Sequence, residues 1–216
     1  LRYDMTRPQI GRLTWIGTSL GAAVLLAYLN FAFGWVELSR RLSLVFAFAI
    51  GPAGIIAVHG LTERLSARHS KEALRLGAAF LIAAFSLLTL MLTIQQALFA
   101  EYLKLKATAA PEAMTALAQA YNLANQVQLG ADVAFDIFYC IGLFTISSAL
   151  LSTPGLPRVL GLYGVVSSVC LLGLNLWTFP IGPKSAGAFD LGPATILWWV
   201  GLVVLDRRQL KRTEAA

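Results

Sequence analysis

Six long apolar runs constrain this chain more than any other feature. A helix needs roughly 20 mostly apolar residues to cross the hydrocarbon core of a bilayer. The runs are continuous rather than alternating, which favours helices over the strands of a transmembrane barrel. The sequence therefore predicts an all-α, polytopic transmembrane bundle with six spans, at about residues 13–35, 42–61, 76–100, 129–151, 159–179 and 191–205.

The segments outside this transmembrane domain (13–205) are short. Residues 1–12 are expected to form a cytoplasmic N-terminal segment and residues 206–216 a basic cytoplasmic tail. The first run is too long for a signal-peptide core and lacks a small-residue cleavage pattern, so we expect an uncleaved span. The chain begins with Leu1, and Met5 is a second candidate for the true start.

Composition supports a membrane protein. Of the 216 residues, 57% are hydrophobic and only 13% are charged, whereas charged residues make up about a quarter of typical soluble domains. The net charge of +6 does not indicate nucleic-acid binding, because the basic residues are spread between the apolar runs. The expected partners are the lipid bilayer and either other membrane subunits or a second copy of the chain.

Basic residues also predict the orientation, because cytoplasmic loops are enriched in Lys and Arg. With both termini inside, 12 of the 17 Lys and Arg residues lie on the cytoplasmic side. Arg40 and Arg41 are exceptions in the first outer turn. We expect their forked guanidinium groups to pair with carboxylates at the rim of an outer pocket. The candidates for this rim are Glu37, Glu101 and Asp190, and Asp190 is also the expected N-cap of the sixth helix.

The stretch QVQLGADVAFDIFYC places Asp132 and Asp136 one helical turn apart within the fourth span. A helix turns by about 100° per residue, so five polar residues share an arc of about 80°. An acidic residue at the bilayer centre costs roughly 2.5 kcal/mol or more, and the stripe should therefore face the bundle interior or a water-filled cavity. Its members are Asn125, Gln128, Asp132, Asp136 and Tyr139.

Two other spans carry polar or small residues at three- and four-residue spacing. The third has Ser86, Thr89, Thr93 and Gln96, and the fifth has Gly164, Ser168, Leu171, Asn175 and Thr178. Together with the acidic stripe they predict a polar vestibule open to the outer face. The alternative to a vestibule, given equal weight, is that these polar residues form hydrogen bonds that only hold the helices together. The predicted ligand-binding residues are Asp132, Asp136, Gln128, Asn125, Tyr139, Gln96 and Asn175.

Pro111 and Glu112 indicate a helix start. The segment Glu112–Gln128 is then either an amphipathic helix on the outer surface or an extension of the fourth span.

Motifs for catalysis, metal ions and cofactors do not stand out. The chain has two histidines and contains no HExxH, GxSxG or Walker sequence. We therefore expect a protein that is not an enzyme, with no catalytic residue, metal ligand or cofactor to assign.

Three motifs carry a family resemblance: NQVQLGADVAFD at Asn125–Asp136, NLWTFP at Asn175–Pro180 and FDLGP at Phe189–Pro193. Their order and spacing resemble a family of small bacterial six-span membrane proteins that is known as a domain of unknown function. The resemblance implies a six-helix fold in the bacterial cytoplasmic membrane. It implies no activity, ligand or catalytic residue.

The leading hypothesis is an outer-facing acidic pocket that binds or transports a small polar or cationic ligand. The alternative is a non-enzymatic accessory subunit of a larger membrane complex, in which the polar stripe is a docking seam for another helix. An intramembrane enzyme acting on lipid headgroups is a third, weaker hypothesis.

Overall fold

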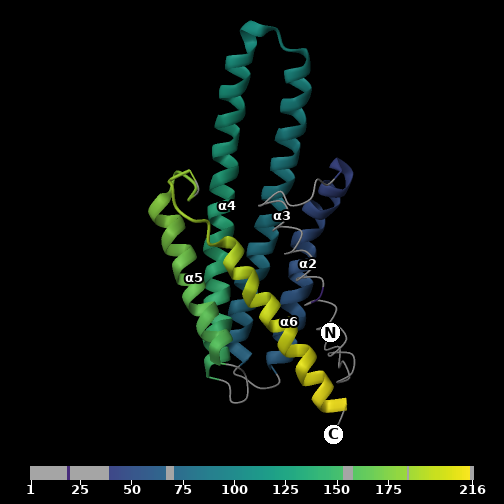
Figure 1. Cartoon of the computed structure of the whole chain (residues 1–216), viewed down its shortest axis with the longest axis vertical. Coiled ribbons are helices and arrows are strands. Elements are labelled where there is room, and N and C mark those ends of the chain that lie inside the picture. The colour runs from purple at the N-terminus through teal and green to yellow at the C-terminus, as the bar shows by residue number, and fades with distance from the viewer. Residues whose placement is uncertain (1–18, 20–38, 67–70, 153–157, 184, 215–216) are drawn as a thin grey trace.

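The computed structural model describes residues 19, 39–66, 71–152, 158–183 and 185–214. Within these ranges all of the regular secondary structure is helical, with no strand. The elements are helices α2 (Arg40–Ser66), α3 (Lys71–Thr108), α4 (Met114–Leu151), α5 (Arg158–Thr178) and α6 (Gly192–Glu214), with a short 3₁₀ helix, η1 (Pro111–Ala113), between α3 and α4 (Figure 1).

Four of the described helices are long and apolar enough to cross a membrane, and the protein is membrane-embedded. Their apolar stretches are Arg41–Glu63, Glu72–Thr108, Pro111–Leu151 and Arg158–Thr178. They contain the predicted spans at 42–61, 76–100 and 129–151, and all but one residue of that at 159–179. The predicted span at 191–205 corresponds to α6, whose described apolar stretch, Gly192–Leu202, is shorter. The predicted span at 13–35 lies outside the described residues.

Helices α3 and α4 form a hairpin that is longer than a bilayer is thick. Each has 38 residues, which corresponds to about 57 Å of helix, against a hydrocarbon core of about 30 Å. The hairpin extends past the ends of α2 and α5 (Figure 1). The segment Glu112–Gln128 is thus an extension of the fourth span, and the surface-helix alternative is wrong. We call residues 99–125 the α3–α4 arm, in which Tyr102 and Tyr121 stack with ring centroids 4.3 Å apart.

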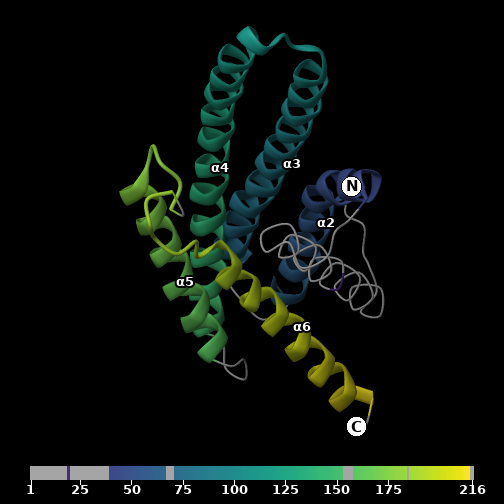
Figure 2. The same ribbon diagram turned by 45° about the horizontal axis from the view of Figure 1, so that its top comes forward.

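The helices pack around a core that α3 and α4 share with α2, α5 and α6. Leu81 on α3, Leu143 and Ile146 on α4 and the paired Trp198 and Trp199 on α6 are almost completely buried. Helix α6 starts beside α4 and α5 and crosses the bundle obliquely (Figure 2). This crossing brings the first turns of α6 over the middle of α4, where the acidic stripe lies.

Small residues allow α5 to approach α4 and α6 closely. Gly164 and Ser168 are both buried, and small residues at this four-residue spacing permit close approach of helix backbones. A Cβ on Gly164 would meet the side chains of Ser147 on α4 and Trp198 on α6. Because Gly164 adds no side chain of its own here, α5 packs closely against α4, and Asn175, three turns further along α5, contacts α4.

Candidate functional site

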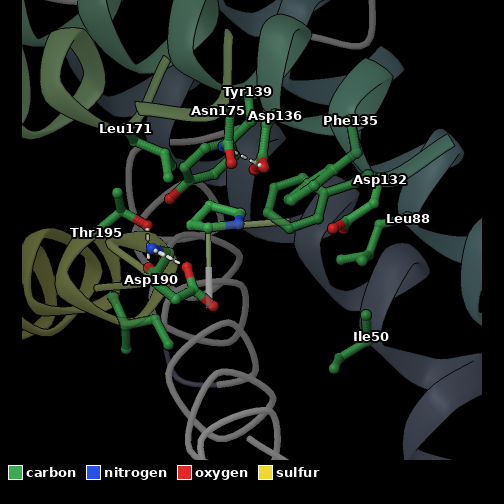
Figure 3. A pocket seen from close by; sticks show the side chains of 14 residues that line it. Ile50, Leu88, Asp132, Phe135, Asp136, Tyr139, Leu171, Asn175, Asp190 and Thr195 are labelled. Carbon is green, nitrogen blue, oxygen red and sulfur yellow. Dashed lines mark hydrogen bonds between the residues drawn. The ribbon is translucent and has the colours of Figure 1, made fainter. Parts of the chain in front are cut away.

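A cavity of about 90 Å³ lies where α4, α5 and the start of α6 meet, and we call it the inner cavity. Side chains from all five described α-helices and from the α5–α6 loop line it (Figure 3). Half of its polar side chains come from α4, and the others come from α5, α6 and the α5–α6 loop, whereas its apolar lining is spread over all five helices. The lining residues are Ile50, Phe85, Leu88, Asp132, Phe135, Asp136, Tyr139, Leu171, Asn175, Pro183, Asp190, Gly192, Thr195 and Ile196.

The carboxylate of Asp136 is bound to α5. Asn175 Nδ2 donates a hydrogen bond of 2.7 Å to Asp136 Oδ2 (Figure 3). Asn175 is only 5% exposed, so its amide has few alternative partners. The bond satisfies one oxygen of Asp136 and leaves the carboxylate facing the inner cavity.

Asp132 has a different environment. Within the described part of the chain its carboxylate makes no hydrogen bond and no ion pair. It lines the inner cavity and also a second, larger cavity of about 420 Å³ between α2, α3 and α4. We call this second space the outer cavity. Its lining residues are Ala47, Ile50, Met91, Leu92, Gln95, Gln96, Phe99, Tyr121, Gln128 and Asp132.

Two hydrogen bonds fix lining residues of the inner cavity, one at the start of α6 and one between α6 and α4. Asp190 Oδ1 accepts a hydrogen bond of 2.8 Å from the backbone N–H of Gly192, as expected of a residue that caps the start of α6. Trp199 Nε1 donates a hydrogen bond of 3.0 Å to the hydroxyl of Tyr139. These bonds fix Asp190 and Tyr139 in the lining of the cavity.

The depth of the carboxylates follows from helix length. Measured from the end of α4 at Leu151, Asp136 lies about 22 Å and Asp132 about 28 Å along the helix. The hydrocarbon core is about 30 Å thick. Asn175 also lies near the end of its helix, since α5 ends at Thr178. With Leu151 placed at one boundary of the core, the carboxylates lie close to the other boundary, on the side of the α3–α4 arm.

The structure brings most of the predicted ligand-binding residues together. Asp132, Asp136, Tyr139 and Asn175 line the inner cavity, and Gln96 and Gln128 line the outer cavity with Asp132. Asn125 lines neither of these two cavities.

The predicted rim charges are dispersed. Asp190 lines the inner cavity itself. Glu101 lies on the α3–α4 arm, where it pairs with Lys104 at 3.5 Å. Arg41 is exposed at the start of α2 and makes no ion pair with a described residue. Glu37 and the side chain of Arg40 lie outside the described residues, and the expected pairing of Arg40 stays a prediction.

Only part of the polar stripe on α3 faces the interior of the bundle. Ser86 and Thr93 are exposed, and their hydroxyls donate to the carbonyls of Ile82 and Thr89 on their own helix. A serine or threonine hydroxyl that bonds to the carbonyl four residues earlier needs no partner on another helix. The hydroxyls of Ser168 and Thr178 on α5 also bond to carbonyls of their own helix. The predicted members of the α5 stripe are nevertheless all buried, namely Gly164, Ser168, Leu171, Asn175 and Thr178.

Sequence reasoning missed the aromatic walls and the contribution of α6. Phe85 and Phe135 line the inner cavity, as does Thr195 in the first turn of α6. Phe135 directly precedes Asp136, and this adjacency was the available signal. Phe85 carries no such signal, because one phenylalanine among many apolar residues of a span is unremarkable in sequence.

The polar lining of the site is acidic. Three carboxylates line the inner cavity, while the described linings of both cavities contain no Lys, Arg or His. Among the described residues, no group of three or more His, Cys, Asp or Glu side chains is arranged to hold a metal ion.

Searches against protein-family models, curated proteins and solved structures find no match to this chain.

Proposed function

We propose that this protein is a six-span protein of the bacterial cytoplasmic membrane, with both termini inside. In this proposal its two connected cavities form an outer-facing pocket for a small polar or cationic ligand. The pocket serves transport or sensing, and we assign no catalytic residue to it. The observation that carries the proposal is that Asp132 and Asp136 face cavity space, with no basic residue in the described lining.

The energetics of buried charge favour a ligand over simple helix packing. A carboxylate that only held helices together would be expected to have its hydrogen-bonding capacity satisfied by the neighbouring helix. Asp136 has one such bond, to Asn175, whereas Asp132 has none with a described residue. Ionisable residues within a membrane protein are costly and commonly mark substrate or ion pathways.

The outward orientation rests on the distribution of charge. The ends of α2 and α4, and the starts of α3 and α5, lie at the end of the bundle opposite the α3–α4 arm (Figure 1). The helix ends here include Arg64, Lys71, Arg75 and Arg158. Such enrichment is typical of the cytoplasmic side, which puts the carboxylates near the outer boundary.

Native mass spectrometry of the protein in mild detergent tests this function. We expect a small molecule bound to the wild-type protein and absent from the double variant Asp132→Asn, Asp136→Asn. The single variant Asp132→Asn is included because Asp132 makes no hydrogen bond with a described residue and its replacement should not disturb folding.

The matched control is the double variant Glu101→Gln, Glu112→Gln, which removes two carboxylates from the α3–α4 hairpin, outside both cavities. It should keep the bound molecule. The function is refuted if both aspartate variants fold and carry the same bound species as the wild type, or if the wild type carries none.

A further inference from the structure

We propose that the ligand of this pocket is an organic ammonium ion, whose charged group sits against Asp132 and Asp136 and whose uncharged part extends into the outer cavity. This inference rests on the proposed function and specifies the class of ligand. It excludes two other classes that a polar pocket could serve, namely inorganic cations and neutral polar molecules.

The charge of the lining is the first step. Asp132, Asp136 and Asp190 line one cavity of about 90 Å³. Only two of their oxygens have a partner among the described residues, through the hydrogen bonds from Asn175 and from the backbone of Gly192. The amide and hydroxyl groups of the pocket compensate little of this charge. A bound cation would compensate it, whereas a neutral ligand would leave it unbalanced.

The aromatic walls are the second step, and they favour an organic cation. Tyr139 forms ring contacts with both Phe135 and Phe85, at centroid distances of 5.4 Å and 6.3 Å. All three rings line the inner cavity, and in Figure 3 the ring of Phe135 lies between the carboxylates of Asp132 and Asp136. Ring faces attract ammonium groups, and alkylated ammonium ligands are recognised in this way.

An inorganic cation fits the lining less well. Metal ions in proteins take several oxygen ligands at once, six to eight for calcium. Among the described residues no set of three acidic, histidine or cysteine side chains is placed to do this. A ring beside a carboxylate suits a cation that carries its own apolar substituents.

The shape of the pocket is the third step. Asp132 and Ile50 are the two described residues that line both cavities, so Asp132 lies between the smaller space and the larger one. The outer cavity has about 420 Å³ and presents amide groups and apolar side chains but, apart from Asp132, no charge. A ligand with a cationic end and a neutral remainder matches this division. The neutral lining residues involved are Met91, Leu92, Gln95, Gln96, Phe99 and Gln128.

Thermal unfolding of the full chain in detergent, at constant ionic strength, tests this inference. The ligands are choline, tetramethylammonium, butylammonium and dimethylbutanol, which is the uncharged carbon isostere of choline. We expect the ammonium compounds to raise Tm and dimethylbutanol to have no effect. Choline should bind more tightly than tetramethylammonium, because its hydroxyethyl group reaches further into the pocket.

Two variants assign the effect to the pocket. Asp132→Asn should weaken choline binding by about tenfold or more, a loss typical of one charged contact. Glu112→Gln, which removes an exposed carboxylate at the tip of the hairpin, should leave choline binding unchanged.

Several results would overturn the inference. They are an equal Tm increase with dimethylbutanol, an equal increase with sodium or potassium ions, unchanged choline binding in Asp132→Asn, and no increase with any ammonium compound. If one of these occurs while mass spectrometry finds an aspartate-dependent bound molecule, the ligand class is wrong and the proposed function stands. If mass spectrometry also finds none, both fail.

Discussion

Asn175 on α5 and Asp136 on α4 are joined by a hydrogen bond of 2.7 Å between side chains 39 positions apart in the sequence. The bond links the buried face of α5 to the acidic stripe of α4 near one boundary of the membrane. It determines which oxygen of Asp136 is available to the inner cavity. The first prediction tests whether the two side chains act together.

A double-mutant cycle with Asn175→Ala and Asp136→Ala should give a coupling free energy of about 1 kcal/mol, the range found for polar contacts between transmembrane helices. Asn175→Ala alone should destabilise the protein, because it leaves a buried carboxylate without its donor. The measurement is the free energy of unfolding in mixed micelles. Pairing Asn175→Ala with Glu112→Ala on the arm is the control and should be additive. Additivity in the Asn175–Asp136 cycle would contradict the structural role given to this bond.

Gly164 should not tolerate a side chain. A Cβ at this position would overlap Ser147 Oγ and lie 2.6 Å from Trp198 Nε1, and both residues are completely buried. We expect Gly164→Ala to lower the free energy of unfolding by about 1–3 kcal/mol through overpacking.

Gly173 on the same helix is the matched control, because a Cβ there meets nothing within 4 Å. Gly173→Ala should be neutral or stabilise by up to about 1 kcal/mol, since alanine favours helix formation. Equal effects of the two alanines would show that α5 does not approach α4 and α6 closely at Gly164.

Tyr139→Phe should destabilise the protein by about 1–3 kcal/mol. The change removes the hydroxyl that accepts a hydrogen bond from Trp199 Nε1, and Trp199 is only 1% exposed, so water cannot replace the acceptor. Unfolding followed by tryptophan fluorescence measures the effect. Tyr121→Phe on the arm, where the ring stacks on Tyr102, preserves the stacking and should change stability by less than about 0.5 kcal/mol. A harmless Tyr139→Phe would mean that the Trp199 bond contributes little.

Cysteine labelling tests the predicted orientation. The background variant replaces the two free cysteines, Cys140 and Cys170, by alanine. In intact cells a membrane-impermeant maleimide should label Glu112→Cys at the hairpin tip. It should label Arg158→Cys, at the start of α5, only after permeabilisation. The reverse pattern would place the carboxylates near the cytoplasmic boundary and would remove the outer-facing pocket from the proposed function.

Periodicity within a single helix was a good guide to the buried face of α5. Gly164, Ser168 and Asn175 share a face by spacing alone, and that face is buried. The same reasoning was wrong for Ser86 and Thr93, which bond to their own helix and face outward. Spacing identifies which residues share a face, but it does not show where their hydrogen bonds go.

The apolar runs determined by themselves that this protein is helical and embedded in a membrane. Hydrocarbon offers the backbone no hydrogen bonds, so an apolar segment of this length satisfies its own as a helix. The four-residue spacing of Asp132 and Asp136 also determined that they share one face of their helix. Only the tertiary structure decided that this face meets Asn175, Phe85 and Thr195 around a cavity. Contacts such as that of Tyr139 with Trp199 join residues 60 positions apart, and the rotation and crossing of separate helices depend on packing between them, which no local spacing specifies.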